Sequence, residues 1–319
     1  MAGFGKDSRF GFSAGARAGA LYGQSEEIVY RSPQSPDYYS QLLWDIKPMV
    51  YAGADLSFTV NEFRNVPGFY TNLSFKAGIP LRSGIMEDRD WMNPLDYSIL
   101  TNYSASNNYI TRAFLADLAL GVSIPLKYRD RIFAFLKLGG AVSYMYFDWI
   151  ARDGYTQYDR AGGWDPADPK DPLYGDQVEY YQHWLAVSPG IAVTVPIRSR
   201  WLIEFSLNVV PGLIWCWALD QHLGYERYLQ NHPMEDQNHP TEFQDRPVGG
   251  ILLEPGLEVS YAFNERLALA GAVSYRHIQN SRGDNRDRRI GGAYSPWIPN
   301  TAGAAFRAMD VGLTLKVFF

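Results

Sequence analysis

The 319-residue sequence lacks any apolar run of roughly 18 or more residues, and helical periodicity is almost absent from it. The stretch from Gly212 to Leu219 is among the longest segments without a charge or an amide. A membrane-spanning helix needs about 20 mainly apolar residues, so the first absence excludes one. Soluble α/β enzymes of this length usually show helical periodicity, so the second absence argues against that class.

Disulfides, an apolar leader and a basic charge balance are also missing. The single cysteine, Cys216, cannot form an internal disulfide, and without companion ligands it predicts no metal site. The first residues, Met1 to Lys6, lack the apolar segment of a secretory signal. We therefore interpret the sequence as a mature chain whose leader has been removed. The formal net charge of −5 argues against nucleic acid as a partner.

Alternating hydrophobicity and aromatic residues are abundant, with 22 Tyr, 17 Phe and 9 Trp. A closed β-barrel can cross a bilayer without helices, and its signature is segments of about ten alternating residues with interfacial aromatics. The C-terminal stretch shows this best, because odd positions from Met309 to Phe319 are apolar while even positions from Asp310 to Lys316 are small or polar. One face suits lipid and the other a polar lumen. The alternative is the last strand of a soluble β-sandwich.

Counting alternating segments bounded by turn residues predicts ten strands. We therefore predict an all-β fold, a ten-stranded antiparallel transmembrane β-barrel with long extracellular loops, as a single domain over residues 1–319. The predicted strands lie near 9–31, 38–60, 67–83, 105–127, 131–153, 178–198, 200–219, 246–264, 266–282 and 303–319.

Short and long connections alternate along the chain, which is typical of an even-stranded barrel with both termini on the periplasmic side. This topology puts the long connections at the outer mouth. Pro48 and Pro211 lie inside predicted strands and indicate bulges or bends. The predicted short turns are 61–68, 128–130, 199 and 264–265, and the predicted long loops are 32–37, 84–104, 154–177, 220–245 and 283–302.

Two acidic patterns follow strands that end at the predicted outer mouth, Asp88-Arg89-Asp90 and Asp220-Gln221-His222. Side chains at i and i+2 of a strand share one face, so each pair can act as a unit. An Asp beside a His can orient the imidazole and stabilise its protonated form, which suits a general base. Two neighbouring carboxylates repel, so one is expected to have a raised pKa and to share a proton. The two pairs together indicate that water hydrolyses the substrate directly, without a covalent intermediate.

Two simpler interpretations compete with this one. Outer loops are rich in Asp, so these acids can be solvated surface groups without a chemical role. Zinc binding is a second alternative, but one His with scattered carboxylates is a poor ligand set. His232 and His239 are seven residues apart, which matches no familiar metal motif. We therefore predict no metal.

The segment from Ser83 to Pro94, which contains Asp-Arg-Asp-Trp-Met, together with Asp220-Gln-His222, closely resembles the paired signatures of the omptins. Omptins are aspartyl-type endopeptidases of the bacterial outer membrane. Shorter matching patches are 23–30 and 40–44. The resemblance implies that Asp88 and Asp90 form an acidic couple and that Asp220 and His222 form a base couple. It also places the attacking water between Asp88 and His222, at a mouth that faces outward.

The family resemblance also implies a preference for basic residues, selected by acids in the cleft. Glu27 matches one such substrate-binding acid, but the second family position is Ala218 here. A missing carboxylate is expected to weaken selection for Arg or Lys on one side of the cut. Residues 84–104, 154–177 and 220–246 hold 15 Asp and Glu against 5 Lys and Arg, which attracts cationic peptides or proteins. Segment 283–302, with its arginines, is the exception.

No cofactor is predicted, but the family resemblance implies activation by lipopolysaccharide and so outer-membrane lipid as a partner. At the roughly matching positions stand Tyr144, Tyr146 and His183, without the family's arginines. Lipopolysaccharide or another glycolipid is thus an expected activator: either the lipid is held differently from the family pattern, or the outer membrane of the source contains unusual glycolipids.

A catalytically silent barrel that acts as an adhesin or receptor is the main alternative function. Tyr155, Tyr158, Trp164 and Tyr174 would supply its contact area. A porin is less favoured, because ten strands enclose a lumen that side chains largely fill.

Overall fold

The computed structural model describes residues 9–61, 64–129, 131–158 and 162–319. Parts of the predicted turns 61–68 and 128–130 and of the predicted loop 154–177 lie outside these ranges, as do residues 1–8. Within these ranges, no helix is long and apolar enough to cross a membrane. The elements are β1 (Phe10–Tyr30), β2 (Tyr38–Val60), β3 (Gly68–Gly78), β4 (Leu81–Asp90), β5 (Asn102–Tyr128), β6 (Arg131–Tyr158), β7 (Asp171–Ile197), β8 (Trp201–Pro211), β9 (Ile214–Gln221), α1 (Leu223–Asn231), β10 (Glu242–Val248), β11 (Ile251–Ala262), β12 (Leu267–Arg288) and β13 (Ile298–Phe318).

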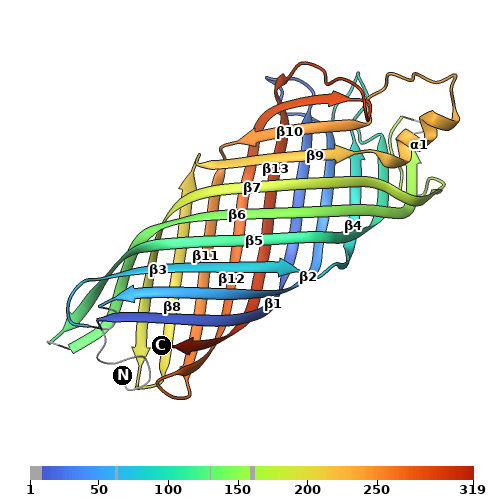
Figure 1. The fold of residues 1–319 in the computed structure, drawn as a ribbon. Coiled ribbons are helices and arrows are strands. Elements are labelled where there is room, and N and C mark those ends of the chain that lie inside the picture. The colour runs from blue at the N-terminus through green and yellow to red at the C-terminus, as the bar shows by residue number, and fades with distance from the viewer. Residues whose placement is uncertain (1–8, 62–63, 130, 159–161) are drawn as a thin grey trace.

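The strands close into a ring of ten, as predicted. Strands β3 and β4 both pair with β2 and β5, β8 and β9 both pair with β7, and β10 and β11 both pair with β12, so each couple forms one interrupted barrel strand. The antiparallel pairing of β1 with β13 closes the ring. Both termini lie at one end of the barrel, and α1 lies at the other, which we call the mouth (Figure 1).

Both prolines mark irregularities, as expected. Pro48 lies where the register of β1 with β2 shifts between Leu21 and Gly23, which is the pattern of a β-bulge. Pro211 is the last residue of β8, and Gly212 follows it with a φ of 84°. Glycine adopts this left-handed conformation without steric cost, so the strand can break here and resume as β9.

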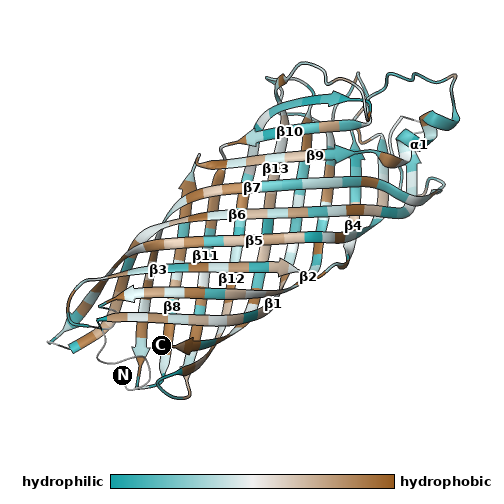
Figure 2. Ribbon diagram, in the orientation of Figure 1, coloured by the Kyte–Doolittle hydropathy of each residue, from teal (hydrophilic) through white to brown (hydrophobic). Residues whose placement is uncertain are grey.

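An apolar band surrounds the half of the barrel near the termini, and hydrophilic residues dominate the mouth end (Figure 2). On β13, Met309 and the odd positions after it are exposed, as the alternation predicts. Asp310 instead faces the lumen, where it accepts a hydrogen bond from Tyr51 Oη at 2.6 Å. The next outward residue beyond Met309 is Arg307, which forms an ion pair with Glu26 of β1, so the band ends there. The stretch from Met309 to Phe319 has the length of the roughly 9–11 tilted strand residues that cross a bilayer.

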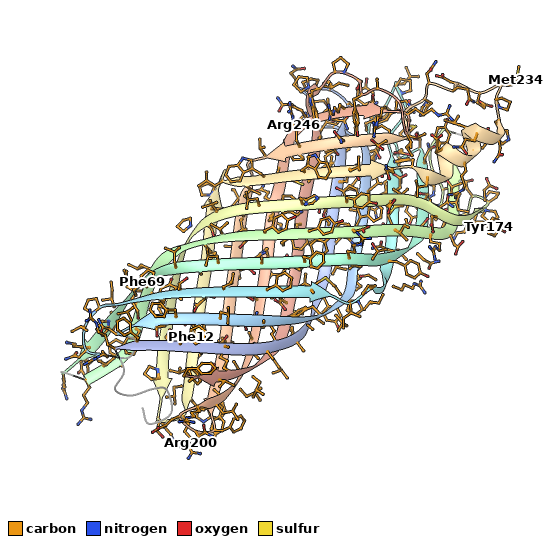
Figure 3. The ribbon with its side chains drawn as sticks, viewed as in Figure 1. Phe12, Phe69, Tyr174, Arg200, Met234 and Arg246 are labelled. Atoms are coloured by element: carbon orange, nitrogen blue, oxygen red, sulfur yellow. The ribbon has the colours of Figure 1, made fainter. Side chains whose placement is uncertain are left out.

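The barrel extends well beyond this band, and four of the five predicted long loops were too long. β5, β6 and β7 contain 27, 28 and 27 residues, whereas about 9–11 tilted residues cross a bilayer. Residues 84–90, 171–177, 242–245 and 283–288, all predicted as loop, belong to strands. Beyond the membrane both faces of the wall can be polar, so the ladder continues although the hydrophobic alternation that reveals strands has ended. In Figure 3, Tyr174, Met234 and Arg246 lie in this extension, opposite the end with Phe12 and Arg200.

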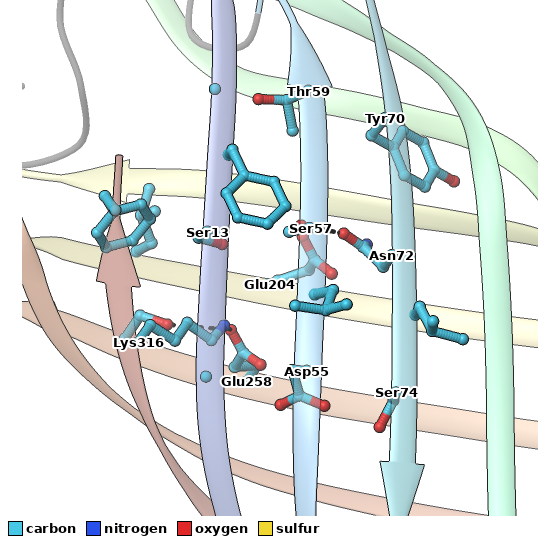
Figure 4. A pocket seen from close by; sticks show the side chains of 18 of the residues that line it. Ser13, Asp55, Ser57, Thr59, Tyr70, Asn72, Ser74, Glu204, Glu258 and Lys316 are labelled. Carbon is cyan, nitrogen blue, oxygen red and sulfur yellow. Dashed lines mark hydrogen bonds and ion pairs between the residues drawn. The ribbon is translucent and has the colours of Figure 1, made fainter.

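The lumen is filled rather than open. Near the termini, polar and charged side chains line a cavity of about 300 Å³, where Lys316 pairs with Glu258 (Figure 4). Between this cavity and the mouth lies an apolar core in which Trp44 stacks on Tyr180 with ring centroids 4.9 Å apart. Phe306 belongs to the same core. Such packing argues against a porin, as the strand number predicts.

Arg276 of β12 joins opposite walls of the lumen, because it pairs with Glu254 of β11 and with Asp117 of β5, each at 2.8 Å. We expect Arg276→Ala to lower the free energy of unfolding by about 3–5 kcal/mol, since it leaves two carboxylates without their cation. Urea unfolding in detergent micelles measures this. Arg112→Ala is the control, because Arg112 is 71% exposed and its contact with Asp148 is 3.9 Å, a pair that contributes about 1 kcal/mol or less. Equal losses of unfolding free energy in the two variants would contradict the stabilising role assigned to Arg276.

Candidate active site

Asp88 and Asp90 are among the last residues of β4, at its mouth end, and their side chains face the lumen. Met86, two residues earlier on the same face, is buried in the apolar core. Ser40, on the neighbouring strand β2, donates a hydrogen bond from Oγ to Asp88 Oδ1 at 3.4 Å. Asn102 of β5 is the Cα partner of Asp90 in the antiparallel ladder. Both acids are therefore held by strands on either side, rather than by the loop that the sequence predicted.

Asp220 and His222 lie at the corresponding end of β9. Asp220 is 3% exposed, and its Oδ2 lies 2.7 Å from His222 Nε2. The backbone N–H of His222 donates to Thr241 O at 2.8 Å, and the ring of Phe243 contacts the imidazole edge at 5.3 Å between centroids. The imidazole thus contacts Asp220 and Phe243, and the Nε2 contact with Asp220 leaves Nδ1 as the nitrogen that can act on a water.

The two couples stand on opposite walls of the mouth and interact electrostatically. Strands β5, β6 and β7 separate β4 from β9 on one side of the ring. Burial lowers the pKa of His222, but Asp220, followed by Asp88 and Asp90, outweighs it and raises the pKa to about 9. The imidazole therefore holds its proton more firmly than an ordinary histidine, whose pKa is about 6.5.

The pKa values of the acidic couple are also raised. Burial raises the pKa of Asp88 well above its ordinary value, and the neighbouring charge of Asp90 adds to this, against the opposing effect of His222. Burial likewise raises the pKa of Asp90. Repulsion between the two acids was the expected cause, but desolvation in the narrow mouth contributes more. The site can thus hold a proton on an acid close to an imidazole, as acid–base chemistry requires.

Glu27 lies on β1 and is 2% exposed, one residue from the outward-facing Glu26. Asp245 of β10 faces it and is also 2% exposed. Sequence reasoning missed Asp245 because it placed residues 220–245 in a loop. Phe243 and Asp245 alternate with Gln244 on β10, and this short alternation is the only signal that the sequence offers.

Other predicted residues occupy the outer wall. Tyr144 Oη lies 2.8 Å from His183 Nδ1, and the ring of Tyr146 lies 4.7 Å from that of His183. In the part of the chain that the structure describes, no group of three or more His, Cys, Asp and Glu side chains is placed to hold a metal ion. Tyr155 and Trp164 line a separate cavity of about 480 Å³ on the outside of β4, β5 and β6.

Comparisons with known proteins identify the family and the fold. The model of the omptin family matches residues 9–319. The structure is similar to that of the outer membrane protease OmpT from Escherichia coli, with a TM-score of 0.79, 14% identity, and coverage of 98% of this chain and 99% of that chain. The toluene transporter TbuX from Ralstonia pickettii gives a TM-score of only 0.33 at 7% identity, with 99% and 91% covered. A search of curated proteins finds no match.

Proposed function

The chain belongs to the omptin family, and from this membership and the mouth geometry we propose that it is an endopeptidase that cuts peptide bonds near basic residues. It is a β-barrel of the bacterial outer membrane. The observation that supports the activity is the Asp220–His222 couple, which faces Asp88 and Asp90 across the mouth. We place this mouth on the outer side of the membrane.

In the proposed reaction, a water lies between Asp88 and His222. His222 takes a proton from it through Nδ1, and the water oxygen bonds to the scissile carbonyl carbon. Asp220 holds the imidazole in place and stabilises its charge, as in other carboxylate–histidine pairs. When the C–N bond breaks, the amine leaves with a proton from the acidic couple or the imidazolium. In the described part of the chain, no hydrogen bond joins His222 to a Ser or Cys, which supports water as the nucleophile.

The test is incubation of the refolded protein with a peptide library, with and without lipopolysaccharide. We expect cuts next to Arg or Lys. Absence of cleavage under every condition would refute the peptidase and favour an adhesin or receptor.

We expect a chelator to leave the rate of cleavage unchanged, because the residues assigned here include a single imidazole and three carboxylates that serve as acids and bases. The measurement is the initial rate with and without EDTA, in defined detergent so that lipid effects are excluded. Loss of activity that added Zn²⁺ restores would contradict the metal-free mechanism.

Glycolipid activation is a separate proposal. Tyr144, His183 and Trp217 form an outward cluster, with ring centroids of His183 and Trp217 5.0 Å apart. Amphipathic rings of this kind suit the lipid–water interface. The cluster contains no arginine, so we propose that it contacts the sugar part of a glycolipid rather than its phosphates.

A further inference from the structure

Position 218 of β9 lacks the carboxylate that the family resemblance implies, but a carboxylate stands directly beside it on the next strand. Ala218 and Asp245 are Cα partners in the antiparallel ladder of β9 and β10. Directly opposed residues share a face of the sheet, and their Cα atoms are about 4.5–5.5 Å apart. Asp245 thus projects into the same part of the lumen as Ala218, and the small alanine side chain leaves that space free.

Asp245 and Glu27 form a buried acidic pair that has no cation. The two carboxyl groups interact electrostatically, because the charge of Asp245 is one of the causes that raise the pKa of Glu27. Asn285 donates from Nδ2 to Asp245 Oδ1 at 2.7 Å, while Glu27 Oε2 is buried without a hydrogen-bond donor in the described part of the chain. No Lys or Arg of the described residues forms an ion pair with either acid. An unpaired oxygen at this depth is costly, so the site favours a cationic group from outside.

The electrostatics agree with a binding site for a cation. Burial, followed by the charges of Asp220, Asp245 and Asp88, raises the pKa of Glu27 well above its ordinary value. Burial, opposed by the Asn285 hydrogen bond and assisted by Asp220, raises the pKa of Asp245 to about 7. The raised pKa values mean that the pair binds a proton more tightly than free carboxyl groups do, and an entering cation can displace this proton.

The position of the pair relative to the base couple suits a substrate side chain. Phe243, which contacts His222, is two residues from Asp245 on the same face of β10. Two strand residues span about 6.6–6.8 Å, comparable with an extended Lys or Arg side chain. A peptide bond held at His222 can therefore place a neighbouring basic side chain between Glu27 and Asp245.

We propose that Asp245 is a specificity-determining residue that forms, together with Glu27, the binding site for an Arg or Lys side chain of the substrate next to the cut. It supplies from β10 the carboxylate that position 218 of β9 lacks. This inference rests on the proposed peptidase function and is an alternative to the expectation that selection for basic residues is weakened.

The test compares two peptides that differ only in arginine or its neutral isostere citrulline next to the cut. Asp245→Asn should lower kcat/KM for the arginine peptide by about 30-fold or more, because a buried cation loses a charged partner. The citrulline peptide should lose far less, so the arginine-to-citrulline ratio of kcat/KM falls at least about tenfold. Asp284→Asn is the control, since Asp284 is an outward acid paired with Arg246, and it should leave the ratio unchanged. Equal losses on both peptides would mean a structural role and would overturn the proposal.

Moving the carboxylate across the ladder sharpens the test. The double variant Ala218→Asp with Asp245→Asn should restore most of the arginine-to-citrulline ratio, because the two positions face the same space. A double variant that keeps the low ratio would refute the shared pocket. If the unmodified protein cuts neither peptide, the peptidase function fails instead, so the two failures are distinguishable.

The pH dependence of the same ratio is an independent readout. In the unmodified protein the ratio should rise between about pH 6 and 8 as the pair loses its proton, and Asp245→Asn should flatten this rise. Using a ratio cancels the titration of His222, which acts on both peptides. The other titratable groups around the pair are Asp220 and Cys216 of β9, Asp88 of β4 and Tyr180 of β7. If the arginine-to-citrulline ratio of the unmodified protein did not change with pH, this would contradict the proposed loss of a proton from the Glu27–Asp245 pair.

Discussion

His222→Ala and Asp88→Ala should each lower kcat for a basic peptide by about 10³-fold or more while the barrel still folds. His222 is the proposed base, and general acid–base catalysis contributes about 10²–10⁴-fold. In the proposed mechanism Asp88 stands across the mouth and orients the same water, so both variants should remove the attack rather than the binding of substrate. The measurement is single-substrate kinetics on refolded variants whose strand content is checked by circular dichroism.

Two control variants each remove an acid or a histidine that has no proposed role in catalysis. Glu87→Ala removes the acid next to Asp88 on β4, but Glu87 faces outward, where it pairs with Arg89. His232→Ala removes an exposed histidine at the opposite end of α1 from His222, where its Nδ1 lies 2.8 Å from Tyr228 O. Both controls should retain nearly full activity. Normal cleavage by either His222→Ala or Asp88→Ala would contradict the proposed roles of His222 as the base and of Asp88 in orienting the water.

Activity should rise steeply with pH. Because Asp220 and the acidic couple raise the pKa of His222 to about 9, the neutral imidazole is the minor form at pH 7. The base must be neutral to accept a proton, so kcat/KM should increase about tenfold per pH unit between pH 6 and 8 and level off near pH 9. This is more alkaline than the near-neutral titration expected from an ordinary histidine. The pH profile for a citrulline peptide, which lacks a titrating substrate group near the cut, measures it.

The cause of this shift can be tested separately. Asp220→Asn removes the largest effect that raises the pKa, so the His222 titration observed by NMR should move to lower pH. The same variant should lose activity, since the ring loses its carboxylate partner. An unchanged His222 titration in Asp220→Asn, or a pH profile with an apparent pKa near 6.5, would contradict the assignment.

The sequence predicted the barrel well because lipid imposes a strict alternation. The apolar row from Met309 to Phe319 and the ten-strand count are confirmed. Strand ends beyond the membrane were not predictable in the same way. There, water wets the outer face and polar groups also line the mouth, so residues such as Asp88 and Asp245 look like loop residues although they belong to β4 and β10.

The candidate site was predictable only where two titratable residues share one strand. Asp88 with Asp90, and Asp220 with His222, are two residues apart and face the lumen as expected. Ser40 and Asp245 act on these residues from other strands, and their positions depend on ladder register. Register between strands far apart in sequence cannot be read from local periodicity, so partners from β2 and β10 emerged only from the structure.

The most direct test is a crystal structure of the refolded protein at a resolution that orders water. The proposed mechanism predicts one water within about 2.6–3.2 Å of both an Asp88 carboxylate oxygen and His222 Nδ1. Side chains of the two couples too far apart to share that water, with or without a bound peptide, would contradict it.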